Sequence, residues 1–140
     1  MLTERQLAER VGAIPGMGRI AAALADAPPC YLVGGAVRDL LLGRLPADVD
    51  IAVEGDAEEA ARLLAAELGG SVEPHRRFGT ATIAPSAATG LPHEINLAGT
   101  RRETYQVPGA LPEVEPAPLS EDLRRRDFTV NAMAVDLVAR

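Results

Sequence analysis

Lysine and tryptophan are absent from this 140-residue chain, and all 14 of its basic residues are arginine. Without lysine the chain cannot use a P-loop lysine or form a Schiff base, so both mechanisms are excluded. Its only aromatic residues are two tyrosines and two phenylalanines. The core must therefore be built from Ala, Leu, Val and Ile, and few side chains are left for stacking on bases.

Cysteine and long apolar runs are also scarce. The single cysteine, Cys30, cannot form an internal disulfide and is interpreted as a small buried thiol in a reducing cytoplasm. No apolar run is long enough to span a membrane, and the N-terminus has no signal-peptide pattern, which also favours a cytoplasmic location. The net charge of −6 is unfavourable for an isolated RNA-binding protein.

Hydrophobic residues make up 47% of the chain, enough for one domain with an ordinary core. Apolar residues at helical spacing predict two helical pieces within residues 3–26, broken near Pro15 and Gly16. Strands and helices are then predicted in alternation, with strands at 30–33, 49–53, 72–75, 80–84 and 94–98 and helices at 36–42 and 56–68.

The last third of the chain has a different composition. Residues 104–119 contain four prolines and little apolar periodicity, so a loop or flap is predicted there. Residues 120–125 and 129–137 are predicted to be helical or mixed, with Ser120 as a candidate helix cap. Because the sequence stops directly after an apolar run, we expect a truncated chain or the first domain of a longer protein, and self-association is plausible.

Two glycines between a predicted strand and a predicted helix form the first group of candidate site residues. Gly34 and Gly35 allow a backbone to approach a ligand closely, and the helix that follows offers free N–H groups. Arg38, one turn into that helix, can add a bidentate phosphate contact. Such a turn alone is more often purely structural.

Two aspartates, Asp48 and Asp50, form the second group. Residues two apart on a strand point to the same face, so these carboxylates repel each other unless a cation lies between them. Hard oxygen ligands suit magnesium. An acidic turn without metal is the structural alternative.

The third group is a basic run, Arg124 to Arg126, followed by Asp127 and Asn131. Asp127 and Asn131 are four residues apart and share one face if the segment is helical. Buried Arg–Asp pairing is the structural interpretation. Contact with phosphate or ribose is the functional one.

In this order the three groups resemble the head domain of bacterial class II CCA-adding enzymes and the related poly(A) polymerases. The resemblance rests on YLVGGAVRDLLLG at residues 31–43, on Asp48-Val49-Asp50 and on LRRRDFTVNAMA at residues 123–134. The segment from Arg101 to Pro112 also resembles that family's flexible loop. The similarity covers roughly residues 28–137.

This resemblance implies an α/β (α+β) fold, a polymerase-β-like palm in which helices pack on one side of a small mixed sheet. It implies a head domain at residues 28–140, preceded by a helical segment at residues 1–27, with the neck, body and tail domains absent. It also implies transfer of a nucleotide from CTP or ATP to an RNA 3′ end, normally that of a tRNA. The roles that it implies are Mg²⁺ ligation at a two-metal site by Asp48 and Asp50, and nucleotide contacts by Gly34, Gly35, Arg38, Arg126, Asp127 and Asn131.

The chain departs from the family at one position. The family commonly has a third carboxylate where this sequence has Asn96, a neutral residue that can still offer a carbonyl oxygen. Glu94 has the same strand parity and is the candidate substitute. Natural tolerance, an engineered substitution and a loss of activity are the three explanations for Asn96.

Three classes of function follow. The first is an RNA nucleotidyltransferase head, for which missing segments or a partner chain would grip the RNA. The second is a non-catalytic nucleotide-binding or regulatory module, favoured by Asn96 and by the missing neck. The third is a structural domain that kept the fold and lost the site, which the retained Arg38, Asp48, Asp50 and Arg126 disfavour.

Overall fold

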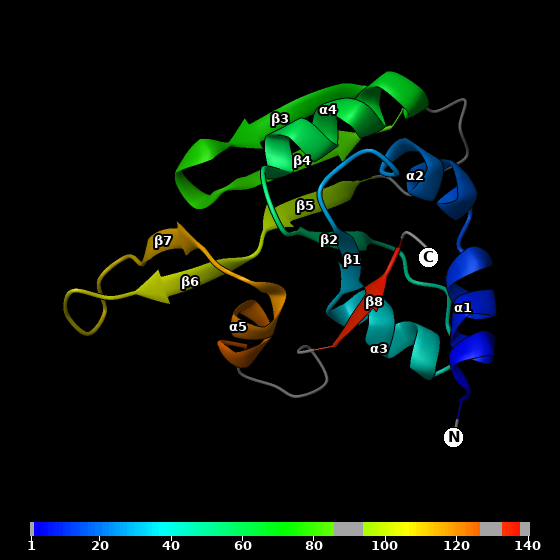
Figure 1. The fold of residues 1–140 in the computed structure, drawn as a ribbon, viewed down its shortest axis with the longest axis horizontal. Helices are drawn as coiled ribbons and strands as arrows, with labels where there is room; N and C mark the ends of the chain where they lie inside the picture. The colour runs from blue at the N-terminus through cyan, green and yellow to red at the C-terminus, as the bar shows by residue number, and fades with distance from the viewer. Residues whose placement is uncertain (1, 86–93, 127–132, 138–140) are drawn as a thin grey trace.

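The computed structural model describes residues 2–85, 94–126 and 133–137. They form a mixed sheet with packed helices, and a two-stranded hairpin projects from one end (Figure 1). The two predicted N-terminal helices are α1 (Glu4–Gly12) and α2 (Met17–Ala23). Thr3 caps α1, because its hydroxyl accepts a hydrogen bond from the Gln6 backbone N–H at 3.1 Å while the Gln6 side chain accepts one from the Thr3 N–H.

The larger sheet has six strands in the order β3–β4–β5–β2–β1–β8. Strands β2 and β5 run parallel, whereas the other neighbouring strands run antiparallel, so the predicted mixed sheet is confirmed. The bounds of the strands are β1 (Cys30–Val33), β2 (Val49–Val53), β3 (Ser71–His75), β4 (Thr80–Ala84), β5 (Ile95–Gly99) and β8 (Ala134–Asp136).

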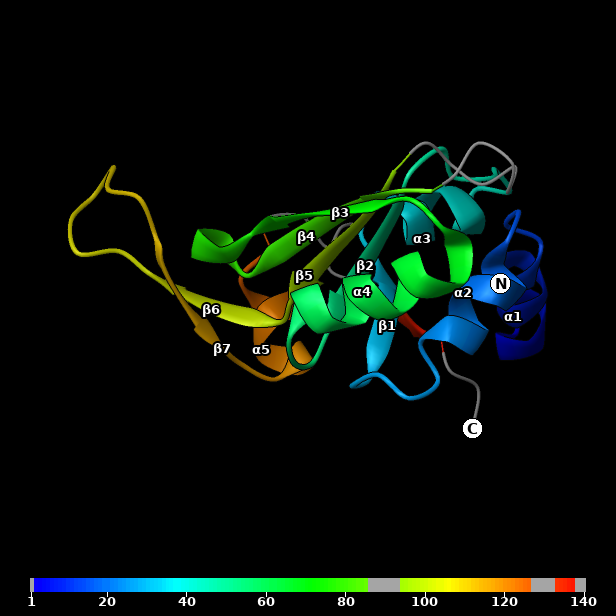
Figure 2. The ribbon, with the colours of Figure 1, turned by 90° about the horizontal axis from the view of Figure 1, so that it is seen from above.

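Helices α3 (Gly35–Leu41) and α4 (Ala57–Leu68) follow β1 and β2. Asp56 caps α4, with its Oδ1 accepting hydrogen bonds from the backbone N–H groups of Glu58 at 2.9 Å and Glu59 at 3.4 Å. Figure 2 shows α4 lying along one face of β3, β4 and β5.

One apolar cluster joins α1, α2, α3 and α4 to the sheet. Strand β2 shows how the two faces differ: Val49, Ile51 and Val53 are buried in this cluster, whereas Asp50 is half-buried on the opposite face. This alternation follows from the two-residue period of a strand. It leaves the face opposite the helices available for polar side chains.

The structure corrects three predictions for the last third of the chain. The predicted loop at 104–119 is wrong at its ends, because β6 (Arg101–Thr104) and β7 (Glu113–Pro116) pair as a hairpin around residues 105–112. Pro116 is tolerated because it ends an edge strand. Helix α5 (Leu119–Arg124) has Pro118 at its N-cap without a side-chain bond, so Ser120 does not cap it and lies in its first turn.

The third correction concerns residues 129–137. Residues 134–136 form β8, because their backbone groups pair with β1, and tertiary pairing overrides local helix preference. Residues 127–132 lie outside the described part of the chain. The structure contains no described helix with the length and apolar character needed to cross a membrane.

Candidate nucleotide and metal site

A row of three polar side chains crosses the face of the sheet that the helices leave open. The backbone register places Thr82 of β4 opposite Asn96 of β5, and Asn96 opposite Asp50 of β2. Each of the three is half-buried. The row brings the predicted Asp50 and Asn96 together on neighbouring strands.

Hydrogen bonds run along this row in one direction. The Thr82 hydroxyl donates to Asn96 Oδ1 at 3.1 Å, and Asn96 Nδ2 donates to Asp50 Oδ1 at 3.4 Å. An ionised carboxylate can only accept, so the amide nitrogen is the Asn96 group that faces Asp50. Asn96 thus orients the Asp50 carboxylate, and its own carbonyl oxygen is already bound by Thr82.

A pocket of about 320 Å³ opens over this row. Elements far apart in the sequence contribute to it: the end of β1, the three strands that carry the row, and the segment after α5. Its polar and glycine lining consists of Gly34, Asp50, Thr80, Thr82, Asn96 and Arg126.

The turn between β1 and α3 requires a glycine. Gly34 has φ 68° and ψ −138°, a combination that a residue with a side chain does not readily adopt. A Cβ added there would lie 3.9 Å from Arg126 Nη1, so the arginine fork reaches the turn from the other side of the pocket. Gly34 and Arg126, two residues that the resemblance assigns to nucleotide contacts, therefore lie close to each other.

Gly35 and Arg38 form a second contact beside that turn. A Cβ on Gly35 would lie 3.2 Å from Arg38 Nη2, so glycine leaves room for the guanidinium. Arg38 is exposed and pairs with Asp39 at 3.1 Å. It lies next to the glycine turn and outside the lining of the pocket, so a ligand must extend beyond the pocket to reach it.

The environment of Asp50 disfavours its charged form. Burial raises the pKa of Asp50 above its ordinary value, the Asn96 hydrogen bond lowers this pKa, Asp48 raises it, and Arg126 lowers it. Asp48 itself is exposed, on the bend that enters β2. Two neighbouring carboxylates, one of them desolvated, are stabilised by a cation placed between them.

Magnesium fits this donor set. In the part of the chain that the structure describes, no three His, Cys, Asp or Glu side chains are grouped so that they could hold a metal ion. Magnesium usually takes one or two protein carboxylates and completes its shell with substrate phosphates and water. Asp48 and Asp50 therefore suit an ion that binds together with a nucleotide.

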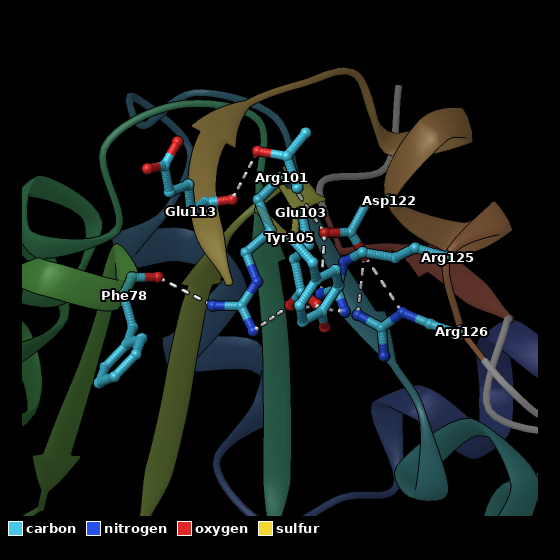
Figure 3. A network of polar contacts seen from close by, with 9 residues as sticks. Phe78, Arg101, Glu103, Tyr105, Glu113, Asp122, Arg125 and Arg126 are labelled. Carbon is cyan, nitrogen blue, oxygen red and sulfur yellow. Dashed lines mark hydrogen bonds and ion pairs between the residues drawn. The ribbon is translucent and has the colours of Figure 1, made fainter. Parts of the chain in front are cut away.

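Asp122, which the sequence analysis did not single out, holds Arg126 in place. It is only 2% exposed, and its Oδ1 accepts hydrogen bonds from Arg126 Nε at 3.1 Å and Nη2 at 3.0 Å (Figure 3). Its Oδ2 accepts from the Arg101 backbone N–H at 2.8 Å and from Arg125 Nη2 at 3.3 Å. The carboxylate thereby joins the base of the hairpin to the pocket.

Two missed residues had usable signals. Asp122 precedes Arg125 and Arg126 by three and four residues, the spacing of side chains on one helical face. Thr82 has the strand parity of a residue facing away from the core, but its neighbour on β5 could not be known without the register.

Glu94 and Cys30 do not line the pocket. Glu94 precedes β5, is exposed and does not line the pocket, whereas Asn96 does. Asp127 and Asn131 fall outside the described residues. Cys30 is buried as predicted, and burial, with a smaller effect of Asp136, raises its thiol pKa to about 11, which favours the protonated thiol at neutral pH.

A family model described as the poly A polymerase head domain matches residues 30–140. Among curated relatives, an A-adding tRNA nucleotidyltransferase of Aquifex aeolicus is 51% identical over 107 residues, which are 76% of this chain and 12% of that protein. The chain thus spans about an eighth of that relative's length.

Solved structures share the fold. The structure of a CCA-adding enzyme in apo form II is 38% identical, with a TM-score of 0.72 over 99% of this chain and 30% of that one. A tRNA nucleotidyltransferase complexed with a primer tRNA and an incoming ATP analogue is 43% identical, with a TM-score of 0.65 over 87% of this chain and 31% of that one. Both agree with the mixed sheet and helices described above.

Proposed function

The chain belongs to the family of poly A polymerase head domains, and we propose from this membership that it is the catalytic domain of an RNA 3′-terminal nucleotidyltransferase. The proposed reaction transfers a nucleotide from ATP or CTP to the 3′-hydroxyl of an RNA, normally a tRNA, and releases pyrophosphate. The chain spans only 12% to 31% of the relatives described above, so other parts of such proteins supply the remaining contacts with RNA.

One observation carries the proposal. A single pocket contains a glycine turn, a guanidinium and a carboxylate that burial makes unfavourable to ionise. These are the groups that a triphosphate and a divalent cation together would satisfy. Stability alone gives no reason to gather them.

The proposed role of each residue is consistent with its position. Gly34 and Gly35 let the triphosphate approach the backbone, and Arg126, oriented by Asp122, binds it inside the pocket. Arg38, next to Gly35, reaches the part of the triphosphate that extends out of the pocket. Arginine suits this task because its planar fork binds phosphate oxygens in pairs.

Asp48 and Asp50 are the proposed magnesium ligands, with Asn96 holding the Asp50 carboxylate in position. Magnesium bound there would supply Lewis-acid chemistry, neutralising charge on the phosphates as the reaction proceeds. With Asn96 in place of a third acid, the protein contributes two carboxylates to this site. Two is within the range that magnesium accepts when substrate phosphates complete the shell.

In the proposed step, the RNA 3′-oxygen forms a bond to the α-phosphorus of the nucleotide. The bond between that phosphorus and the oxygen bridging to the β-phosphorus breaks, pyrophosphate leaves with the bonding electron pair, and the hydroxyl proton passes to solvent. The described residues hold the triphosphate and offset its charge. Positioning and charge stabilisation supply most of the acceleration in such a transfer.

Calorimetric titration of CTP and ATP into this chain, with and without magnesium, tests the proposal. The Asp48→Ala/Asp50→Ala double variant should lose magnesium-dependent binding. An Asp26→Ala variant, which removes an exposed carboxylate that does not line the pocket, should keep it. Equal binding by wild type and double variant would refute the assignment of the metal ligands.

A non-catalytic nucleotide-binding module is the second candidate function, and Asn96 favours it because this residue brings no charge to the metal site. Incorporation of labelled nucleotide into a tRNA that lacks its 3′-terminal nucleotide distinguishes the two. Binding without incorporation, measured in the presence of the remaining domains of a related enzyme, would favour the second candidate.

A further inference from the structure

A second hollow, which the proposed transfer does not use, lies where the hairpin meets the larger sheet. One part, of about 290 Å³, lies between the start of α4, strand β7 and the single 3₁₀ turn η1 (Arg76–Phe78). Another part, of about 400 Å³, lies beside the hairpin loop. Arg77 and Val114 line both parts, which we together call the hairpin groove.

Three arginines line the hairpin groove in a chain whose net charge is −6. Arg76 pairs with Glu58 at 3.0 Å, and Arg101 pairs with Glu103 at 3.0 Å. Arg77 has no ion pair within residues 2–85, 94–126 and 133–137, and its guanidinium carbon lies 5.6 Å from the centre of the Phe78 ring. Arg77 is thus an exposed cation without a described ion pair, in a groove that Asp56 and Glu113 also line.

Phe78 gives the groove an apolar, planar surface beside that cation. It is 38% exposed, although it is one of only four aromatic residues in the chain. Next to it, Gly79 lines the groove and has open space where a Cβ would be. An aromatic ring with a guanidinium over it is a surface on which a nucleic-acid base can stack while the arginine contacts phosphate.

The hairpin groove begins where the nucleotide pocket ends. Thr80 and Ala98 are paired residues that line the pocket, and their outer neighbours, Gly79 and Gly99, line the groove. The Gly99 N–H donates to the Gly79 carbonyl at 2.9 Å, so one hydrogen-bonded pair of backbones separates the two hollows. The two hollows thus adjoin at this end of the sheet, and the groove extends from there to the start of α4.

We propose that the hairpin groove binds the single-stranded RNA that leads to the 3′ end, with a phosphate at Arg77 and a base against Phe78. This inference rests on the proposed nucleotidyl transfer. An acidic protein segment could satisfy Arg77, but it would not use the exposed ring, so the pairing of Arg77 with Phe78 favours RNA.

Fluorescence anisotropy with a short fluorescein-labelled oligocytidine RNA at low salt tests the groove. Phe78→Ala should weaken RNA binding by about tenfold, the scale of one base stack. Arg77→Gln should reduce the slope of log K against log salt by about 0.7, because one phosphate contact with a single strand is lost. Both side chains are exposed, so both variants should keep the wild-type melting temperature.

Arg62→Gln and Tyr105→Ala are the matched controls. They remove an exposed arginine and an exposed aromatic outside the hairpin groove and should leave RNA affinity unchanged. All four variants should bind CTP and magnesium like the wild type, because none of the changed residues lines the nucleotide pocket.

RNA binding that the groove variants weaken, with the controls intact, supports the inference. Wild-type affinity in both groove variants, absence of RNA binding by the wild type, or displacement of the RNA by an equal concentration of polyglutamate would overturn it. If the groove inference is overturned while CTP still binds, the proposed nucleotidyl transfer is not affected. Loss of CTP binding with groove-dependent RNA binding intact would refute the transfer instead.

Discussion

Asn96 occupies the middle of the polar row, where it receives a hydrogen bond from Thr82 and donates one to Asp50. We predict that Asn96→Asp lowers the magnesium concentration needed for half-maximal CTP binding by about tenfold, because a third carboxylate joins the ligand shell. Calorimetric titrations of CTP at a series of magnesium concentrations measure this. The metal-free variant should also melt at a lower temperature, because like charges then lie opposite each other on β2 and β5.

Thr82→Val is the control for that substitution. It removes the hydroxyl that binds Asn96 and adds no charge, so it should not lower the magnesium requirement. If Asn96→Asp leaves the magnesium requirement unchanged, position 96 does not contribute to the metal site.

Asp50 gives a prediction about pH. Burial raises its folded-state pKa above the ordinary value of 3.8, so the folded protein binds more protons than the unfolded chain above that pH. The stability of the metal-free protein therefore falls as the pH rises from 3.8 through the folded pKa. Asp50→Asn should remove this loss and raise the melting temperature at neutral pH in EDTA, with little difference below pH 3.8.

Thermal melts at a series of pH values measure this difference. Asp26→Asn removes an exposed carboxylate of the same kind and should leave the melting temperature unchanged throughout. A wild type as stable as Asp50→Asn at neutral pH would show that burial does not penalise this carboxylate.

At the scale of elements, Asp122 links three segments: β6, the end of α5 and the arginine in the pocket. Asp122→Asn removes the buried negative charge that Arg125 and Arg126 share, although Arg125 keeps its ion pair with Glu103. We expect the free energy of unfolding in urea to fall by about 3 kcal/mol, as it does when one charged partner is removed from a buried ion pair. CTP affinity should fall as well, because Arg126 loses the group that orients it.

Glu121→Gln is the matched control one residue away. Glu121 pairs with Arg102 on the exposed side of the hairpin, where water screens the interaction. This variant should keep both the stability and the CTP affinity of the wild type. A similar loss in both variants would mean that the hairpin as a whole, rather than Asp122, supports Arg126.

Sequence patterns predicted the helices and strands that have a local signal, and they failed where the pairing of distant strands determines the structure. The helix that begins after Asp56 and the alternation of β2 follow from the pattern of neighbouring residues, whereas the cap at Thr3 was not predicted. The prolines at 108, 112 and 116 led to the prediction of a loop where β6 and β7 pair as a hairpin. Strand β8 forms because its backbone pairs with β1. The pocket shows the same division: Gly34 and Asp50 come from motifs, whereas Thr82 required the strand register.

At the scale of the whole molecule, one apolar cluster of the described residues includes side chains from the N-terminal helices. The family match begins at residue 30, and the sequence analysis placed the head domain at residues 28–140. Helices α1 and α2 and their flanking turns nevertheless bury Val11, Ile14, Met17, Ile20 and Leu24 in the same cluster as the strands. The apolar surface beneath these side chains would meet water if the helices were removed.

We therefore predict that deletion of residues 1–27 abolishes cooperative unfolding in urea and magnesium-dependent CTP binding, although every proposed site residue is retained. Ile20→Ala gives a graded version of the same test. Its side chain is fully buried, so truncation should cost about 2–5 kcal/mol of unfolding free energy while CTP still binds to the folded fraction. A cooperatively folded fragment 28–140 that binds CTP would show instead that the first 27 residues are dispensable, and that the sheet with α3 and α4 alone holds the site.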